Sequence, residues 1–71
     1  MKNKKIQIYI NGKIKNINTN YSLINILEDF SLKNKLIAIE VNKEVVPKSK
    51  YKTKRINHND KIEIVELIGG G

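Results

Sequence analysis

The stretch Ile6–Gly12, which reads IQIYING, contains the clearest indication of the fold. Isoleucines at positions 6, 8 and 10 alternate with other residues, and this period of two with β-branched side chains is typical of a half-buried strand. Asn11-Gly12 follows at once and favours a two-residue turn, because both central residues of such a turn need positive φ. A weaker strand pattern comes next, over Lys13–Ile17. The chain is therefore expected to open with a β-hairpin.

A helical pattern follows the hairpin. Apolar residues at positions 23, 26, 27 and 30 fall at i, i+3, i+4 and i+7, so they form one stripe of a helix. Ser22 suits the N-cap because its hydroxyl can accept a hydrogen bond from a free backbone N–H. Asn34 is expected to stop the helix, since Asn tolerates the left-handed conformation. The segment predicts a short helix with one apolar face against a sheet.

Three more strands are expected in the second half of the chain. Leu36–Val41 is a nearly continuous apolar run, which favours a central strand buried on both faces. After a turn at Asn42-Lys43, Glu44–Val46 returns as a short strand that Pro47 ends, because proline cannot donate to a ladder. Lys61–Ile68 is the last expected strand.

This order of elements predicts an α+β fold, with one main helix on one face of a mixed sheet of four or five strands. The β-grasp (ubiquitin-like) arrangement also places the last strand beside the first, in parallel. That pairing comes from the known pattern of the fold and not from periodicity. Residues 1–68 are expected to form one domain, and residues 69–71 a flexible C-terminal glycine tail.

Length and composition limit the possible functions. A domain of 71 residues buries only about 60% of its unfolded surface. That leaves no room for a core and a large substrate cleft, so we do not expect an enzyme. The chain has no cysteine and one histidine, which excludes a thiol nucleophile and a cysteine-ligated zinc site. No metal or bound cofactor is expected.

No apolar run approaches the roughly 20 residues of a membrane span, so the expected location is the cytoplasm, or the plastid stroma if the protein is plastid-encoded.

The net charge is +7, which raises the possibility of a nucleic-acid surface. The alternative is a coding bias, because Lys, Asn and Ile all have A/T-rich codons; we favour the bias, and nucleic acid is not an expected partner.

In Lys48–Arg55, lysines recur every second residue. On an extended segment they would share one face and could bind phosphates or an acidic partner. A solvated loop is the favoured interpretation.

The terminal Gly69, Gly70 and Gly71 carry the chemistry that we expect. The alternative is simply a frayed end. Three residues extend at most about 10 Å, and without Cβ atoms such an arm can enter a narrow channel of a partner and present the Gly71 carboxylate. A carboxylate is a poor electrophile and needs activation, typically as an acyl-adenylate made with ATP. The chain has no phosphate-binding loop, so another protein must activate it.

The last strand also predicts a docking surface. If Ile62 and Ile64 point inward, a period of two turns Glu63, Val65 and Leu67 outward, just before the tail. The alternative is that a loop covers these residues or that a bulge changes the register. The residues expected to contact partners are Glu63, Val65, Leu67 and Ile68.

The chain resembles the thiamine-biosynthesis sulfur carrier family over nearly its whole length. Ile8–Gly12 resembles that family's first strand and turn, and Ser22–Leu27 its helix start. Ile39–Tyr51 resembles its VNxxxVPxSxW stretch, with Tyr where Trp is common, and Asn59–Val65 followed by residues 69–71 resembles its closing segment. The sequence departs from the pattern at position 43, where lysine replaces a frequent glycine.

The resemblance implies that the protein is a sulfur carrier. A ubiquitin-activating-like adenylyltransferase would adenylate Gly71 with ATP, and a persulfide charged by a cysteine desulfurase would convert it to a thiocarboxylate. Thiazole synthase would then take the sulfur into the thiazole ring of thiamine. Gly69 and Gly70 would thread into the partners.

Other interpretations remain. A carrier for molybdenum cofactor has the same chemistry with another acceptor, an RNA-binding ubiquitin-like module would use the positive charge, and a protein-conjugating modifier would form amide bonds. Glu28 and Asp29 are adjacent on the helix and are expected to diverge rather than to form a catalytic pair. His58 lies in a polar turn and is expected to be an exposed bystander.

Overall fold

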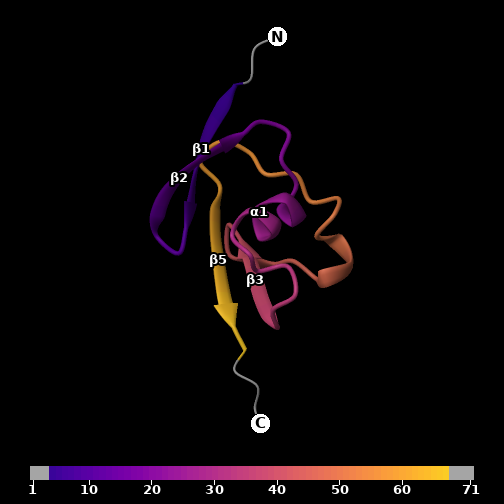
Figure 1. Ribbon diagram of the computed structural model, residues 1–71. Coiled ribbons are helices and arrows are strands. Elements are labelled where there is room, and N and C mark those ends of the chain that lie inside the picture. The colour runs from indigo at the N-terminus through magenta and orange to yellow at the C-terminus, as the bar shows by residue number, and fades with distance from the viewer. Residues whose placement is uncertain (1–3, 68–71) are drawn as a thin grey trace.

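The computed structural model describes residues 4–67 as a five-stranded sheet with one helix against one of its faces (Figure 1). The strand order across the sheet is β2-β1-β5-β3-β4. The elements in chain order are β1 (Lys5–Ile10), β2 (Lys13–Asn18), α1 (Leu23–Asp29), β3 (Ile37–Val41), β4 (Glu44–Val45), a single 3₁₀ turn η1 (Lys48–Lys50) and β5 (Lys61–Glu66).

The opening hairpin forms as predicted. β1 and β2 pair antiparallel, with Ile10 opposite Lys13, and the turn residues Asn11 and Gly12 have φ of 50° and 83°. These positive angles are the ones that a two-residue turn requires. The second hairpin uses the same geometry between β3 and β4, where Asn42 and Lys43 have φ of 52° and 71°. The unusual lysine at position 43 therefore occupies a left-handed position, which glycine adopts without strain.

β5 lies between β1 and β3 and gives the sheet its mixed character. It pairs parallel to β1, with Ile10 opposite Ile62, and antiparallel to β3, with Ile39 opposite Ile64. The expected pairing of the last strand with the first is thus confirmed. The order of strands around the helix is the β-grasp arrangement, so the expected fold class is confirmed as well.

The prediction that Leu36–Val41 is buried on both faces is wrong, although β3 is an interior strand of the sheet. β3 lies between β5 and β4, and β5 is the central strand. Ile39 is fully buried, but Ala38 is exposed. The physical reason is that α1 covers only one face of the sheet. The small apolar Ala38 lies on the uncovered face, so the run is continuous in sequence without being buried on both sides.

The helix buries the predicted stripe. Leu23, Ile26 and Leu27 are buried against the isoleucines of β1 and β5, and Phe30 is partly buried beside them. Burying a Leu or Ile side chain stabilises the fold by about 1.5–3 kcal/mol. Such residues therefore hold this small core together.

Ser22 is the N-cap of α1, as predicted, whereas the end of the helix differs from the prediction. At the start, the Asn25 carboxamide oxygen accepts hydrogen bonds from the N–H and the hydroxyl of Ser22, at 2.9 and 3.0 Å. At the end, the helix stops before Asn34, because Ser31 adopts a φ of 59°. The N–H groups of Ser31 and Leu32 then bond to the carbonyls of Glu28 and Leu27, which is a Schellman closure. Serine in place of glycine hid this stop signal in the sequence.

Candidate functional site

β5 carries the chain toward the C-terminus from the middle of the sheet (Figure 1). The predicted strand extended to residue 68, but β5 ends at Glu66. One further backbone bond holds the chain, from the N–H of Leu67 to the carbonyl of Leu36 at 2.8 Å. Ile68 and the glycine tail, Gly69 to Gly71, lie outside the described residues. The sheet thus fixes the chain up to Leu67, two residues before the predicted glycine tail.

The register of β5 is the predicted one. Ile62 is buried with 1% of its surface exposed, and Ile64 is partly buried against the core. On the opposite side, Glu63 is exposed and the exposed fractions of Val65 and Leu67 are 59% and 47%. Within residues 4–67 no loop covers these side chains and no bulge changes the register. The expected outward orientation is therefore confirmed.

Neighbouring strands extend this surface, which we call the open sheet face. Residues directly opposite each other in a sheet share a face, so Ala38 lies beside Val65, and Val45 lies beside Glu40. The exposed large apolar side chains of the described residues are Ile14 (56%), Leu36 (66%), Val45 (71%), Val65 (59%) and Leu67 (47%). Ile14, Leu36 and Val45 were not predicted as site residues. The alternation in β2 and β4 was the only sequence signal for Ile14 and Val45, and Leu36 was part of the apolar run that leads into β3.

The open sheet face also has a small acidic centre. Glu40 and Glu63 are directly opposite each other on β3 and β5. Like charges in this position destabilise a sheet by a few tenths of a kcal/mol to about 1 kcal/mol. The face next to the tail is therefore apolar with two adjacent carboxylates, and Lys61 lies beside Glu63 on the same side of β5.

Asn11 holds β5 at the point where β1 ends. Its side chain donates to the carbonyl of Ile64 at 3.1 Å and accepts from the Ile64 N–H at 2.8 Å. Its own backbone N–H donates to the carbonyl of Ile62 at 2.9 Å. The Asn11 carboxamide thus continues the β1–β5 ladder beyond the turn. Fifty-three residues separate the two partners in the sequence, so only the turn role of Asn11 could be predicted.

The other candidate groups have structural roles. The Asp29 carboxylate accepts a hydrogen bond from the Tyr21 hydroxyl at 2.8 Å, while Glu28 forms an ion pair with Lys33 at 3.4 Å. The hydrogen bond to Asp29 raises the pKa of Tyr21 above its usual value, with desolvation and the carboxylate charge acting in the same direction. Glu28 and Asp29 therefore diverge, as expected. The exposed His58 accepts the Gln7 N–H at 3.0 Å, which fixes the loop before β5.

Two further properties concern only the described part of the chain. Among residues 4–67, no group of three or more His, Asp and Glu side chains is placed to hold a metal ion. In the same range no helix has the length and apolar character needed to cross a membrane.

Residues 8–71 match the ThiS family. The sulfur carrier protein ThiS of Bacillus subtilis is 34% identical over 65 residues, which cover 90% of this chain and 98% of that protein. The uncharacterised protein ycf40 of Porphyra purpurea is 38% identical over 71 residues, the full length of both chains. A thiazole synthase of Paramagnetospirillum magneticum is 36% identical over 66 residues, and there the chain spans only 20% of the relative's length.

The fold has a solved counterpart. The crystal structure of the thiamine biosynthesis protein ThiS from Geobacter metallireducens matches with a TM-score of 0.80, covering 93% of this chain and 100% of that one. At 19% sequence identity this match concerns the fold alone. The family match begins at Ile8 within β1 and extends over the other strands to the terminal glycines. The chain therefore belongs to the ThiS family.

Proposed function

We propose that this protein is a sulfur carrier of thiamine biosynthesis, and that the Gly71 carboxylate is the group that carries sulfur. The observation that supports it most is the family match, which continues from β5 through the terminal glycines to Gly71. The Bacillus subtilis relative, similar over almost its whole length, is named as a sulfur carrier. In this proposal the protein is a substrate of its partners and not an enzyme.

The chemistry needs a partner adenylyltransferase of the ubiquitin-activating type. A Gly71 carboxylate oxygen attacks the α-phosphorus of ATP, and pyrophosphate leaves. The terminal sulfur of a protein persulfide, charged by a cysteine desulfurase, then attacks the acyl-adenylate carbon and displaces AMP. A partner thiol reduces the resulting acyl disulfide, which releases the thiocarboxylate and leaves a disulfide between partner sulfurs. Since the chain has no cysteine, both thiols must come from partners.

The open sheet face is the proposed docking surface for these partners. Val65 and Leu67 expose apolar surface directly before the tail, and burying such side chains contributes up to about 1.5–3 kcal/mol each. Glu63 adds a carboxylate to the same face, and Ile68 follows it in sequence. Gly69 and Gly70 then span the distance into the partner's active site. Docking of the sheet makes delivery of the tail an intramolecular event, which raises its effective concentration.

The proposed sulfur acceptor is a thiazole synthase. Support comes from a thiazole synthase of Paramagnetospirillum magneticum that contains a segment similar to 93% of this chain, although the chain spans only 20% of that protein. A carrier and its acceptor joined in one polypeptide would always be neighbours.

The full-length similarity to ycf40 of Porphyra purpurea supports the plastid stroma as the location, with the cytoplasm as the alternative.

The test is the intact mass of the protein after incubation with ATP, an adenylyltransferase, a cysteine desulfurase and cysteine. We expect a gain equal to the replacement of one oxygen by one sulfur. The Bacillus subtilis relative, loaded by its own partners, is the positive control, and a variant that lacks Gly71 is the negative control. An unchanged mass with partners that load the Bacillus relative would overturn the proposal.

A further inference from the structure

The segment Lys48–Arg55, which we call the basic segment, carries charge that the proposed function does not use. It contains five basic residues, and no Asp or Glu occurs between residues 45 and 59. The ion pairs found within residues 4–67 involve Lys33 and Lys35 instead. None of the four lysines of the basic segment has a described carboxylate within 4 Å. Such a concentration of like charge destabilises the folded chain unless a partner of opposite charge binds it.

The basic segment is held firmly against the helix start. The N–H groups of Leu23 and Ile24 donate to the carbonyls of Lys54 and Tyr51, at 2.9 and 3.0 Å. Tyr51 is buried in the core with 7% of its surface exposed. The segment thus supplies acceptors that the first turn of a helix lacks. Its lysines project from a fixed backbone rather than from a loose loop.

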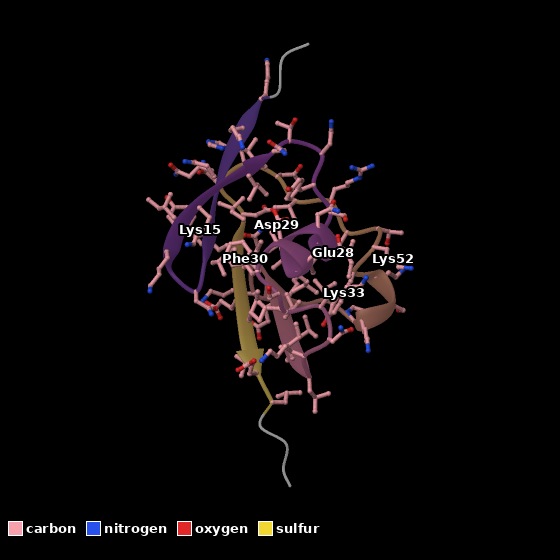
Figure 2. The ribbon with its side chains drawn as sticks, viewed as in Figure 1. Lys15, Glu28, Asp29, Phe30, Lys33 and Lys52 are labelled. Atoms are coloured by element: carbon pink, nitrogen blue, oxygen red, sulfur yellow. The ribbon has the colours of Figure 1, made fainter. Side chains whose placement is uncertain are left out.

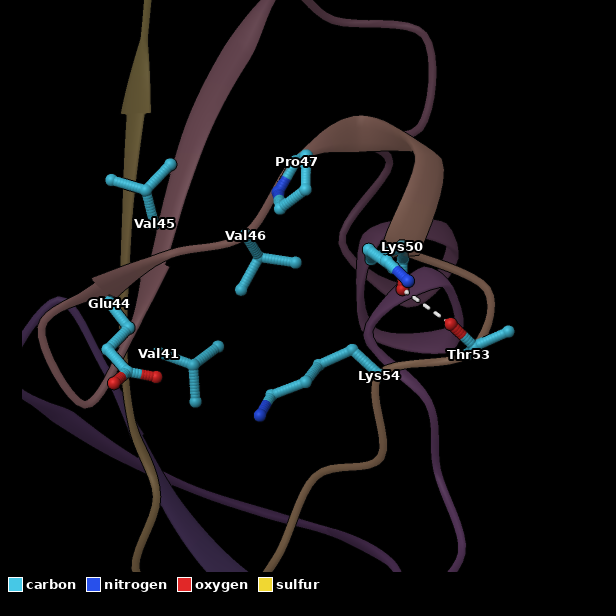
Figure 3. Close-up of a pocket in the computed structure, with 8 residues that line it drawn as sticks. All are labelled: Val41, Glu44, Val45, Val46, Pro47, Lys50, Thr53 and Lys54. Atoms are coloured by element: carbon cyan, nitrogen blue, oxygen red, sulfur yellow. Dashed lines mark hydrogen bonds between the residues drawn. The ribbon is translucent and has the colours of Figure 1, made fainter.

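The lysines do not share one face, contrary to what an extended segment would give. Because η1 and the following turn coil the chain, Lys50 and Lys54 line one pocket, while Lys48 and Lys52 line another. In the first pocket, Glu44 faces Lys54 from the edge strand β4, so the charges are mixed (Figure 3). The second pocket also includes Lys33 and has no acidic side chain in its lining. We call it the basic pocket.

The basic pocket has an apolar floor and a basic rim. Its volume is about 430 Å³, with Ile24 and Tyr51 at the apolar side and Lys33, Lys48 and Lys52 at the rim. Figure 2 shows Lys33 and Lys52 on the side of α1 away from Lys15 and Phe30. The side chains of Lys33 and Glu28, which form an ion pair, are each about half exposed, and such exposed pairs contribute little to stability. Lys33 therefore remains available to a second carboxylate.

We propose that the basic pocket is a second docking surface, and that its occupant is an acidic protein segment with an apolar side chain. The apolar side chain packs on Ile24 and Tyr51, and the flanking carboxylates bind Lys48, Lys52 and Lys33. A nucleic acid fits less well. The Arg55 guanidinium already donates to the Asn20 carbonyl at 2.7 Å, and a phosphate backbone would leave the apolar side of the pocket, at Ile24 and Tyr51, unused.

The start of α1 and the segment around η1, which line the basic pocket, lie on the helix-covered side of the sheet (Figure 1), whereas the open sheet face is the uncovered side. Both surfaces can therefore be occupied at once. The proposal goes beyond the sulfur-carrier function and does not depend on the tail. A partner bound at the basic pocket would remain bound while the tail is processed by another protein.

The test is an amide chemical-shift titration of the full chain with a synthetic peptide in which one Leu is flanked by three Glu on each side. We expect shifts centred on Ile24, Lys33 and residues 48–52. Replacing the peptide's Leu by Ala should weaken binding about fivefold to tenfold. The variant K48E/K52E should weaken it about tenfold or more, whereas the matched control K13E/K43E, with the same change of net charge, should weaken it less than about threefold.

Each opposite outcome overturns the proposal. Equal affinity for the Leu and Ala peptides would show that the pocket takes no apolar side chain. Equal loss in both double variants would show general charge attraction only. Tighter binding of a short RNA duplex at the same amides would assign the surface to nucleic acid. A well-dispersed amide spectrum of K48E/K52E is the check that this variant folds.

Discussion

The open sheet face and the basic segment lie on opposite sides of one small core, and they present opposite surfaces. The face is apolar with a pair of carboxylates, Glu40 and Glu63, while the segment has five basic residues and no acidic one. The open sheet face results from the alternation of side chains along the strands: every second side chain is buried in the core, so the ones between them point outward. The segment results from a coiled loop that is anchored by Tyr51 and by the helix start. A core of this size can thus support two chemically independent surfaces.

The largest expected effect tests whether partners dock on the part of the open sheet face beside the tail or on the face as a whole. V65D/L67D places two charges in the proposed contact, and we expect kcat/KM for sulfur loading to fall about 100-fold, since roughly 3 kcal/mol of apolar contact is lost. Stability should change little, because both side chains are exposed. The matched control is I14D/V45D, which changes exposed side chains of the same face farther from β5. An equal loss in both variants would show that docking is not localised at β5.

The next effect concerns how β5 is held. N11G keeps the left-handed turn but removes both side-chain bonds to Ile64, and we expect a loss of about 1–2 kcal/mol in the free energy of unfolding. N59G is the matched control, because Asn59 has a φ of 71° and its side chain makes no hydrogen bond with the described residues. Urea unfolding measures both variants, and hydrogen exchange at the Ile64 amide should rise only in N11G. Similar stabilities for the two variants would refute the role given to Asn11.

A smaller effect should raise the free energy of unfolding instead of lowering it. Lys43 has a φ of 71°, and an L-residue in this conformation is strained by roughly 1–2 kcal/mol. We expect K43G to stabilise the chain by about 0.5–1 kcal/mol, after the greater entropy of glycine in the unfolded state is included. K13G, in the extended strand β2, should destabilise it. Thermal unfolding of both variants decides the matter, and a destabilised K43G would show that the turn does not strain Lys43.

The smallest effect compares the two surfaces directly. E63Q removes the charge opposite Glu40, and K52Q removes a charge near Lys48. Both should raise stability by a few tenths of a kcal/mol at low salt, and the gain should fade at high salt. K33Q, which breaks the ion pair with Glu28, should act in the opposite direction. If K52Q lowers stability at low salt, the basic segment is not under electrostatic strain, and the case for a second partner weakens.

The two regions also differ in how far the sequence could predict them. Asn11-Gly12 fixed the first hairpin, the stripe from Leu23 gave the helix, and the alternation around Ile62 gave the outward direction of Val65. These signals are local, and the core enforces them. They were sufficient for the helix, for the strands and for half of the open sheet face, whereas the parallel pairing of β5 with β1 was expected only from the known pattern of the fold.

The remaining features depend on contacts between distant parts of the chain. The bonds from Asn11 to Ile64, and from Asn42 to the buried Asp60, leave no pattern in a single sequence. The end of the helix at Ser31 lacked the usual glycine. The division of the lysines between two pockets depends on the coiling of η1, which an alternation of lysines does not encode.

The most direct test of the sulfur-carrier function is the position of the sulfur. After loading, fragmentation of the intact protein in a mass spectrometer should place the whole mass difference on the C-terminal fragment that contains Gly71. Treatment with a thiol-alkylating reagent should label that fragment, because the sulfur of a thiocarboxylate reacts with such reagents much faster than a carboxylate oxygen does. Sulfur on a fragment without Gly71, or a loaded protein that resists alkylation, would contradict the account.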